Sequence, residues 1–464
     1  MSSTTSARKS ARPSFACTEC GWTSAKWVGR CGECQAWGTV AENAPTAGPR
    51  TVARAPSGSP AVPIAQVDVE TARARPTGVS ELDRVLGGGF VPGAVVLMAG
   101  EPGVGKSTLL LDVAARAART GRKVLYVTGE ESAGQVRLRA ERIGALEERL
   151  LLAAETDLGS VLGHIEVANP ELVIVDSVQT IASTAVEGIA GGVGQVREVA
   201  AALIAVAKSR DLPLVLVGHV TKDGTVAGPR TLEHLVDVVC QFEGDRHSRL
   251  RLLRAIKNRF GTTDEVGCFD LTETGIEGLA DPSGVFLSHA TQSVPGTCVT
   301  VALEGRRALA TEIQALVTPS ALASPRRTTS GVDSSRLAMV LAVLQSRVRA
   351  PIGNKDVYVS TVGGSRLTEP AVDLALALAT VSDLDGHALA RGMVAMGEVG
   401  LSGELRRITG AGVRLAEAAR LGFTKAIVPA MSVDAGQVPA GMEIVEVPHL
   451  AAAVQAAREV SARA

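Results

Sequence analysis

The chain contains the stretch Gly100-Glu101-Pro102-Gly103-Val104-Gly105-Lys106-Ser107-Thr108. An apolar, strand-like run (94–99) precedes this stretch and a helix-like run (108–118) follows it, which is the setting of a phosphate-binding loop. Backbone N–H groups of the turn and the positive end of the helix would face the phosphate oxygens. Lys106 would reach the β- and γ-phosphates, and the Ser107 hydroxyl would ligate Mg²⁺. We therefore expect a nucleoside triphosphate to bind here; an ordinary glycine-rich turn is the alternative.

The composition favours a globular protein with several domains. With 464 residues, and about 150 residues per domain, we expect roughly three domains, and the 46% of apolar residues can fill their cores. No run approaches the ~18 apolar residues of a membrane span, and the first residues lack the apolar stretch of a signal peptide. The formal net charge of −1 means that any contact with nucleic acid comes from local basic patches. We expect a cytoplasmic protein with no membrane partner.

Changes in composition divide the chain into five segments. These are a disordered tail (1–14), a cysteine-rich module (15–42), a flexible linker (43–66), an α/β domain (67–285) and a second α/β block (286–464). In the first α/β domain, strand-like and helix-like runs alternate, which predicts a mostly parallel sheet with helices on both faces. The predicted strands are 95–99, 124–128, 172–176, 214–218, 236–242 and 250–257. In the second block, we expect a polar loop at 318–332.

Four cysteines in the module 15–42 have the spacing of a structural zinc site. They form two Cys-x2-Cys pairs separated by ten residues: Cys17, Cys20, Cys31 and Cys34. Two such pairs can place four thiolates around Zn²⁺ in a tetrahedron, and four cysteine ligands leave no open catalytic position. A module this small buries little apolar surface, so metal binding would stabilise its fold. Redox-active cysteine pairs are the alternative.

Polar residues at the ends of three predicted strands complete the expected nucleotide site. Asp176 ends the strand 172–176 and would hold the Mg²⁺ shell as a Walker B carboxylate. Glu130 follows the strand 124–128, at the edge where open α/β sheets bind ligands, and would orient the attacking water. The adjacent Glu131 could instead begin a helix. His219 follows the strand 214–218 and could sense the γ-phosphate or be structural.

Two glycine-rich stretches follow the strands that end at Asp176 and near His219. They are 187–195 (EGIAGGVGQ) and 222–230 (KDGTVAGPR). Because both strands are expected to end at the same edge of the sheet, both stretches would face the same side. Long loops of this kind are either mobile surface or ligand-binding loops.

Three motifs together resemble one protein family. They are the four-cysteine module with Trp-Val-Gly-Arg-Cys at 27–31, the phosphate loop at 100–108, and Lys-Asn-Arg-Phe-Gly at 257–261. In combination they resemble the bacterial RadA (Sms) family of DNA-repair proteins, and the resemblance covers nearly the whole chain. It implies a RecA-like P-loop ATPase core with a small N-terminal zinc module and a C-terminal Lon-protease-like α/β domain.

The resemblance also implies roles that spacing alone does not assign. ATP would be the nucleotide, although the loop itself contacts phosphates and not the base. Glu130 would activate water, and His219 would couple the γ-phosphate to the two glycine-rich stretches, which would bind DNA. Lys257 and Arg259 would enter the nucleotide site of a neighbouring subunit and stabilise the transferring phosphoryl group in trans. The implied partners are single-stranded or branched DNA, a RecA-type recombinase, and further copies of the chain in a hexameric ring.

The Lon-like block departs from Lon where proteolysis needs a Ser–Lys pair. Ala371 falls where the serine would be, and Gly412 falls where the lysine would be. We therefore expect a proteolytically inactive domain that supports oligomerisation and offers a surface for DNA. The candidate phosphate contacts are the basic pairs Arg306-Arg307, Arg326-Arg327 and Arg406-Arg407.

Three functions are compatible with these patterns. The first is a DNA-dependent ATPase of recombinational repair that drives branch migration or unwinding. The second is a RecA-like regulatory ATPase that assembles without acting on DNA. The third is an ATP-dependent protease, which the missing Ser–Lys pair disfavours. ATP turnover measured with and without single-stranded DNA separates the first from the second.

Overall fold

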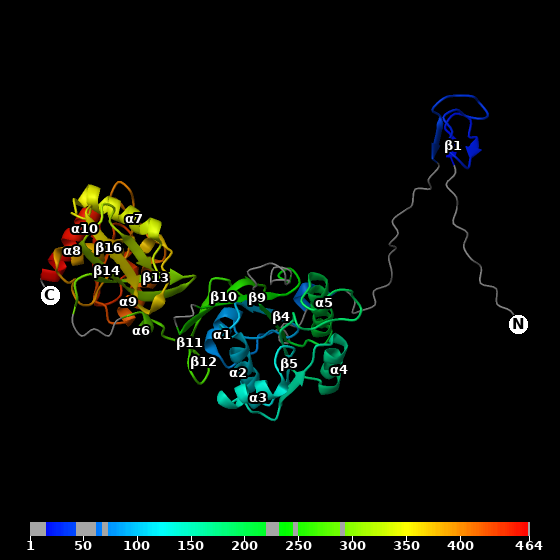
Figure 1. The fold of residues 1–464 in the computed structure, drawn as a ribbon, viewed down its shortest axis with the longest axis horizontal. Coiled ribbons are helices and arrows are strands. Elements are labelled where there is room, and N and C mark those ends of the chain that lie inside the picture. Colours follow the sequence, from blue (N-terminus) through cyan, green and yellow to red (C-terminus); the bar gives the residue numbers. More distant parts are fainter. Residues whose placement is uncertain are drawn as a thin grey trace. The chain divides into compact units, whose positions relative to one another are not determined.

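The computed structural model describes residues 15–42, 62–66, 73–219, 232–244, 249–287 and 293–462. The chain divides into two compact units, Met1–Asp68 and Val69–Ala464 (Figure 1). The predicted tail, most of the predicted linker and the glycine-rich stretch 222–230 lie outside the described residues. The described part of the linker contains one short 3-10 helix, η1 (Ile64–Gln66).

The first unit contains a small antiparallel sheet. Its strands, in the order β2-β1-β3, are β1 (Phe15–Cys17), β2 (Thr23–Ser24) and β3 (Val40–Glu42). Among the described residues of this unit, the buried core consists of Cys17, Cys31 and Val40. So small a core needs a further cross-link to hold a fold, and two of its three members are cysteines of the predicted zinc site.

The second unit begins with a sheet of nine described strands in the order β12-β11-β10-β9-β4-β8-β7-β5-β6. The strands are β4 (Val95–Gly100), β5 (Val124–Thr128), β6 (Leu150–Ala154), β7 (Leu172–Asp176), β8 (Leu214–His219), β9 (Val238–Gly244), β10 (Leu250–Asn258), β11 (Val266–Leu271) and β12 (Ile276–Gly278). Strands β9 to β6 along this order are parallel, as predicted, whereas β10, β11 and β12 extend the sheet in antiparallel fashion.

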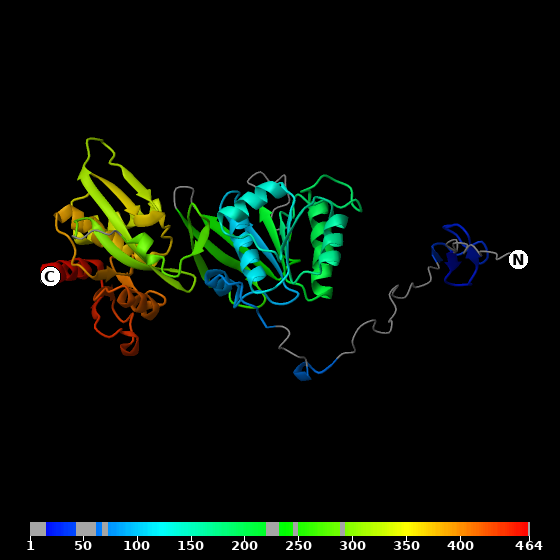
Figure 2. The same cartoon turned by 90° about the horizontal axis from the view of Figure 1, so that it is seen from below.

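Helices cover both faces of this sheet (Figure 2). One face packs against α1 (Ser80–Leu86), α2 (Lys106–Arg119) and α3 (Ala133–Arg142). The other face packs against α4 (Leu158–Ala168) and α5 (Val193–Ser209). Alternate residues of each central strand belong to the two cores, because successive side chains of a strand point to opposite faces. In β4, for example, Val96 and Met98 face α2, whereas Val95 and Leu97 face α5.

The strand register places the predicted site residues at one edge of the sheet. Gly100 at the end of β4 pairs with His219 at the end of β8, and Thr128 at the end of β5 pairs with Asp176 at the end of β7. Asn258, at the end of β10, pairs with Val238, which in turn pairs with Val96 near the start of β4. The 257–261 motif therefore lies at the opposite edge from the phosphate loop.

A second sheet forms the core of the C-terminal part. Its order is β15-β16-β14-β13-β17-β20-β21, with β13 (Thr297–Glu304), β14 (Arg307–Pro319), β15 (Arg327–Ser330), β16 (Lys355–Thr361), β17 (Met393–Ala395), β20 (Lys425–Pro429) and β21 (Glu443–Val447). One face packs against α7 (Ser334–Val343), α8 (Asp373–Asp385) and α10 (Leu450–Ala462), and the other against α9 (Ala411–Arg420). A separate hairpin pairs β18 (Glu398–Val399) with β19 (Leu405–Arg406).

The structure bears on two predictions about the C-terminal part, the polar loop 318–332 and the domain boundary at 285/286. The predicted polar loop 318–332 was wrong in part, because Arg327–Ser330 forms β15, which pairs in parallel with β16. Its polar sequence reflects its place at the edge of the sheet. The predicted boundary between 285 and 286 falls inside the short helix α6 (Ser283–Phe286), and the division into domains there stays a prediction. No helix in the described ranges is both long and apolar enough to span a membrane.

Candidate nucleotide and metal sites

The phosphate loop connects β4 to α2 and leaves the helix N-terminus open. Gly103 and Gly105 have φ angles of +81° and +104°, in the left-handed region that favours glycine. Gly105 is the N-cap of α2, and no side chain caps the helix. The first N–H groups of α2 are therefore available to an anion, as the sequence predicts.

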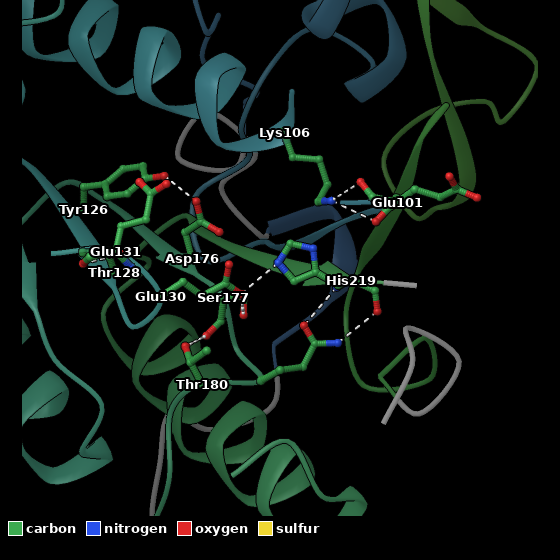
Figure 3. A network of polar contacts seen from close by, with 12 residues as sticks. Glu101, Lys106, Tyr126, Thr128, Glu130, Glu131, Asp176, Ser177, Thr180 and His219 are labelled. Carbon is green, nitrogen blue, oxygen red and sulfur yellow. Dashed lines mark hydrogen bonds and ion pairs between the residues drawn. The ribbon is translucent and has the colours of Figure 1, made fainter. Parts of the chain in front are cut away.

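Lys106 is buried at this helix start and already points along the loop (Figure 3). Its Nζ donates to the carbonyl oxygens of Gly100 at 2.8 Å and Glu101 at 2.9 Å. An ammonium has three donors, so one N–H remains for a phosphate. Burial lowers the pKa of Lys106 to about 8, and the nearby carboxylates of Asp176 and Glu130 oppose that shift. Bound phosphates, like these carboxylates, would raise the pKa of Lys106 and keep its side chain charged.

Asp176 has one oxygen fixed and one oxygen free to bind a cation. The hydroxyl of Tyr126 donates to Asp176 Oδ2 at 2.6 Å. Burial and the Asp176 carboxylate raise the pKa of Tyr126, so its hydroxyl stays protonated and remains a donor. Asp176 Oδ1 is buried and has no hydrogen-bond partner among the described residues. A buried, unpartnered carboxylate oxygen beside the first turn of α2, where Ser107 lies, fits the few protein ligands that Mg²⁺ takes.

Glu130 and His219 come together although 89 residues separate them in the sequence. His219 Nε2 lies 2.9 Å from Glu130 Oε1, and the Ser177 hydroxyl donates to the same oxygen at 2.6 Å. The His219 hydrogen bond is the main cause that lowers the pKa of Glu130 to about 2. The adjacent Glu131 points elsewhere and pairs with Arg139 of α3. Figure 3 shows Glu130 and His219 facing each other beside Asp176.

His219 is held in place through its backbone by Gln179. The His219 N–H donates to Gln179 Oε1 at 2.9 Å, and Gln179 Nε2 donates to the His219 carbonyl at 3.0 Å. Because a carboxylate only accepts, the His219 proton that faces Glu130 is on Nε2. His219 Nδ1 is buried and has no hydrogen-bond partner among the described residues.

Lys257 and Arg259 do not approach the phosphate loop of their own chain. Lys257 Nζ donates to the carbonyls of Glu233 at 2.7 Å and Val236 at 2.8 Å. The Arg259 guanidinium lies 3.4 Å from Asp237 Oδ1, and its side chain is 60% exposed. The two edges are far apart. Along β4, which runs from one edge to the other, the four residues from Val96 to Gly100 alone cover about 13 Å at ~3.3 Å per residue.

The four predicted zinc ligands gather in one cluster. Sγ of Cys17 lies 3.7 Å from that of Cys34, and Sγ of Cys20 lies 3.5 Å from that of Cys31. All four sulfur atoms lie within 4.8 Å of one another. A tetrahedral Zn²⁺ with Zn–S bonds of about 2.3 Å separates its sulfurs by about 3.8 Å. The spacing therefore fits a four-thiolate zinc site better than a pair of redox cysteines.

The basic pairs of the C-terminal part were proposed as phosphate contacts, and for Arg307 this was wrong. Arg307 forms an ion pair with the buried Glu81 and donates to the carbonyls of Val266, Leu279 and Ala280. Its side chain is only 10% exposed, so it is not free to bind DNA. Ala371 lies in the short 3-10 helix η6 (Pro370–Val372) directly before α8, and Gly412 lies in the first turn of α9. Both are near an ion pair between Glu369 and the buried Arg414.

Four side chains at the nucleotide site were missed by the sequence analysis. Tyr126, Ser177 and Gln179 are described above, and Arg251 Nε donates to the carbonyl of Val104 in the phosphate loop at 3.2 Å. Two of them carried a signal. A tyrosine in the middle of an apolar strand needs a partner for its hydroxyl. The alternation of β10 places Arg251 on the same buried face as Leu253.

Comparison with known proteins connects these sites to a family. Family models match the chain as an AAA domain (60–225), a rubredoxin metal-binding domain (15–42) and subunit ChlI of Mg-chelatase (337–432). DNA repair protein RadA of Mycolicibacterium smegmatis is 55% identical over 97% of this chain and 98% of the relative. The RadA proteins of Mycobacterium tuberculosis and Streptococcus pyogenes are 54% and 43% identical, over 96% and 94% of this chain and 93% and 96% of the relatives. The chain belongs to the RadA family of DNA repair proteins.

Membership of the RadA family confirms the resemblance seen in the sequence. It also confirms the expected fold: a RecA-like α/β ATPase core with an N-terminal zinc ribbon and a C-terminal ChlI/Lon-like domain. The AAA match covers the phosphate loop and supports a bound nucleotide, and the metal-binding match covers all four cysteines and supports Zn²⁺. Among solved structures, that of the RadB recombinase is 27% identical over 43% of this chain and 97% of that chain, with a TM-score of 0.35.

The contact of Tyr126 with Asp176 yields a testable prediction. We expect Tyr126→Phe to raise the Mg²⁺ concentration needed for half-maximal ATP turnover by about tenfold, because partners that orient a metal ligand contribute about that much to metal affinity. Metal-free nucleotide binding should stay unchanged. Mn²⁺ binding to the nucleotide complex, followed by electron paramagnetic resonance, measures the effect without turnover. Tyr358→Phe, at the other tyrosine of the chain, is the matched control. Equal Mg²⁺ dependence in both variants would refute the role of Tyr126.

Proposed function

We propose that the chain is a DNA-dependent ATPase of recombinational repair, which binds single-stranded or branched DNA and drives branch migration or unwinding. The contact between Glu130 and His219 is the observation that supports this most. His219 is the last described residue before 220–231, a segment that contains one of the two predicted DNA loops. DNA bound by the predicted loop would therefore act through the adjoining His219 on the proposed catalytic carboxylate.

In this proposal, DNA controls the basicity of Glu130. The hydrogen bond from His219 keeps the pKa of Glu130 near 2, where a carboxylate is a weak base. Release of His219 would return this pKa toward the ordinary value of about 4.3 and make Glu130 a better acceptor for the proton of the attacking water. The γ-phosphate would compete with Glu130 for the hydrogen bond of His219 Nε2.

The other site residues bind and orient the triphosphate. Lys106 and the free N–H groups at the start of α2 would hold the β- and γ-phosphates. Asp176 and Ser107 would hold Mg²⁺, which supplies charge stabilisation to the phosphoryl group during transfer. Tyr126 fixes the rotamer of Asp176, and Arg251 fixes the loop backbone at Val104.

We further propose that Lys257 and Arg259 act on the nucleotide of a neighbouring copy. Their place at the sheet edge opposite the phosphate loop supports this, because they cannot reach the site of their own chain. Ile256 and Phe260, which flank them, are 51% and 42% exposed. Exposed apolar residues beside a cation are suited to a subunit contact. A head-to-tail contact of this type closes into a ring, for which we propose a hexamer.

The C-terminal part is proposed to be a non-proteolytic domain, residues 286–464, that supports this assembly. Ala371 and Gly412 supply neither a nucleophile nor a base. Nearby, Glu369 Oε1 accepts hydrogen bonds from Arg414 at 2.6 Å and from the Leu303 N–H at 2.7 Å. A buried ion pair with satisfied partners is structural, and it provides no activated nucleophile. A RecA-type recombinase is the proposed protein partner.

Measurements of ATP turnover, DNA binding and casein degradation distinguish this function from the two alternatives. We expect single-stranded DNA to stimulate ATP turnover about fivefold or more, in the range of ordinary coupling between sites. If binding neutralises about four phosphates, the affinity for DNA should fall about 50-fold between 50 and 200 mM salt. A protein that hydrolyses ATP equally with and without DNA, and binds no DNA at low salt, would be a regulatory ATPase. ATP-dependent degradation of casein would instead revive the protease.

A further inference from the structure

The zinc module exposes two large aromatic side chains. Trp27 is 64% exposed and Trp37 is 74% exposed, whereas Trp22 packs over Gly32, where an added Cβ would lie 2.7 Å from its ring. These are all the tryptophans of the 464-residue chain. Within 15–42, Trp27 and Trp37 are also the exposed large apolar residues. Burying these two rings would have enlarged the three-residue core of the module and stabilised its fold. Their exposure therefore indicates that they bind a partner.

The two rings lie close to each other on either side of one glycine. A Cβ added to Gly29 would lie 3.7 Å from the Trp27 ring and 3.8 Å from the Trp37 ring. The Arg30 guanidinium lies over Trp37, 5.7 Å from the ring centroid, and its Nε donates to the Gln35 carbonyl at 2.9 Å. Two flat rings and a fixed cation therefore share one surface, which we call the tryptophan face (Trp27, Gly29, Arg30 and Trp37).

The positive charge of the N-terminal segment lies mostly in the sequence on either side of the module 15–42. Within the module, Lys26 and Arg30 stand against three glutamates. Residues 1–61 contain seven Lys and Arg residues but only three acidic ones, Glu19, Glu33 and Glu42, which gives a formal charge of +4. Four thiolates with one Zn²⁺ would reduce this to +2. The whole chain has a formal charge of −1, so the N-terminal segment is the basic part of an otherwise acidic protein.

We propose that the tryptophan face stacks the bases of single-stranded DNA while Lys26 and Arg30 contact its phosphates. This deepens the proposed function and rests on it. Stacking on aromatic rings tolerates every base, as a repair protein without sequence preference requires, and contributes about 5- to 150-fold in affinity per base. Within 15–42 the exposed large apolar side chains are the two tryptophans alone, and the Arg30 guanidinium over Trp37 adds the cation that base-stacking surfaces use.

Tryptophan fluorescence tests this directly, because the signal comes from the zinc module alone. Single-stranded oligothymidine added to the full-length, zinc-loaded protein should quench the fluorescence, and a duplex of equal length should quench it less. Trp27→Ala and Trp37→Ala should each weaken binding about fivefold or more. Trp27→Phe and Trp37→Phe should retain most of the affinity, since phenylalanine also stacks. Zinc content of one ion per chain shows that each variant keeps its fold.

The control variant is Trp22→Phe, at the packed tryptophan, which should bind DNA and be quenched like the unaltered protein. Unchanged DNA affinity in the Trp27→Ala/Trp37→Ala double variant would overturn the stacking role while leaving DNA-stimulated ATP turnover intact. Quenching by a RecA-type recombinase but not by DNA would also overturn it and assign the face to a protein. Absence of any DNA binding by the unaltered protein would remove the proposed function itself.

Discussion

Lys257→Ala is expected to lower ATP turnover by about 10³-fold while nucleotide binding stays intact. This is the size of effect expected when a cation that a neighbouring subunit supplies to the transition state is removed. The reason is positional. Lys257 lies at the sheet edge opposite its own phosphate loop, so its removal leaves the pocket of the same chain unaltered and impairs that of a neighbour. Turnover and the affinity for a fluorescent ATP analogue, measured on the same preparation, separate the two effects.

The variant needs a control for stability, because Lys257 Nζ also satisfies two backbone carbonyls. Their loss would destabilise the fold by about 1–3 kcal/mol, which a shift in unfolding temperature would reveal. Lys123→Ala is the matched control, because Lys123 also donates to a backbone carbonyl and lies directly before β5, away from the phosphate loop, and this variant should hydrolyse ATP normally. Normal turnover in Lys257→Ala would contradict the proposed trans contact.

Lys106→Ala is expected to abolish function at an earlier step. Loss of a charged hydrogen bond to phosphate should weaken ATP binding about tenfold or more, and turnover should fall about 100-fold or more, as when a transition-state donor is removed. The fold should survive, because Lys106 contacts only two carbonyls of the loop. Lys123→Ala is the matched control, since Lys123 also donates to a backbone carbonyl but lies away from the site. Equal ATP affinity in the two variants would remove Lys106 from the site.

The sequence predicted the core of the fold because its signals are local. An apolar strand, a glycine-rich turn and a helix follow one another directly around Lys106, and each parallel strand that ends in a polar residue adds one side chain to the same edge. For this reason Asp176, Glu130 and His219 could be placed near the phosphate loop before any coordinates. The zinc cluster was equally predictable, since two Cys-x2-Cys pairs leave little choice of geometry.

The side chains that tune the site were not predictable in the same way. Gln179 fixes the backbone of His219 across two strands, and nothing in its own sequence neighbourhood indicates this. The basic character of Arg307 suggested DNA, but its burial against Glu81 depends on contacts between distant segments. Polar side chains acquire such partners through tertiary packing, which residue type and spacing do not encode.

The central claim is that two neighbouring copies build each nucleotide pocket, and mixing the two inactive variants tests it most directly. Lys106→Ala keeps an intact Lys257, and Lys257→Ala keeps an intact phosphate loop. In an equimolar mixture, about one quarter of the head-to-tail interfaces would combine the intact halves. We predict that turnover, close to zero in each variant alone, returns to about one quarter of the unaltered level. A mixture as inactive as its components, under conditions where the copies assemble, would contradict the shared pocket.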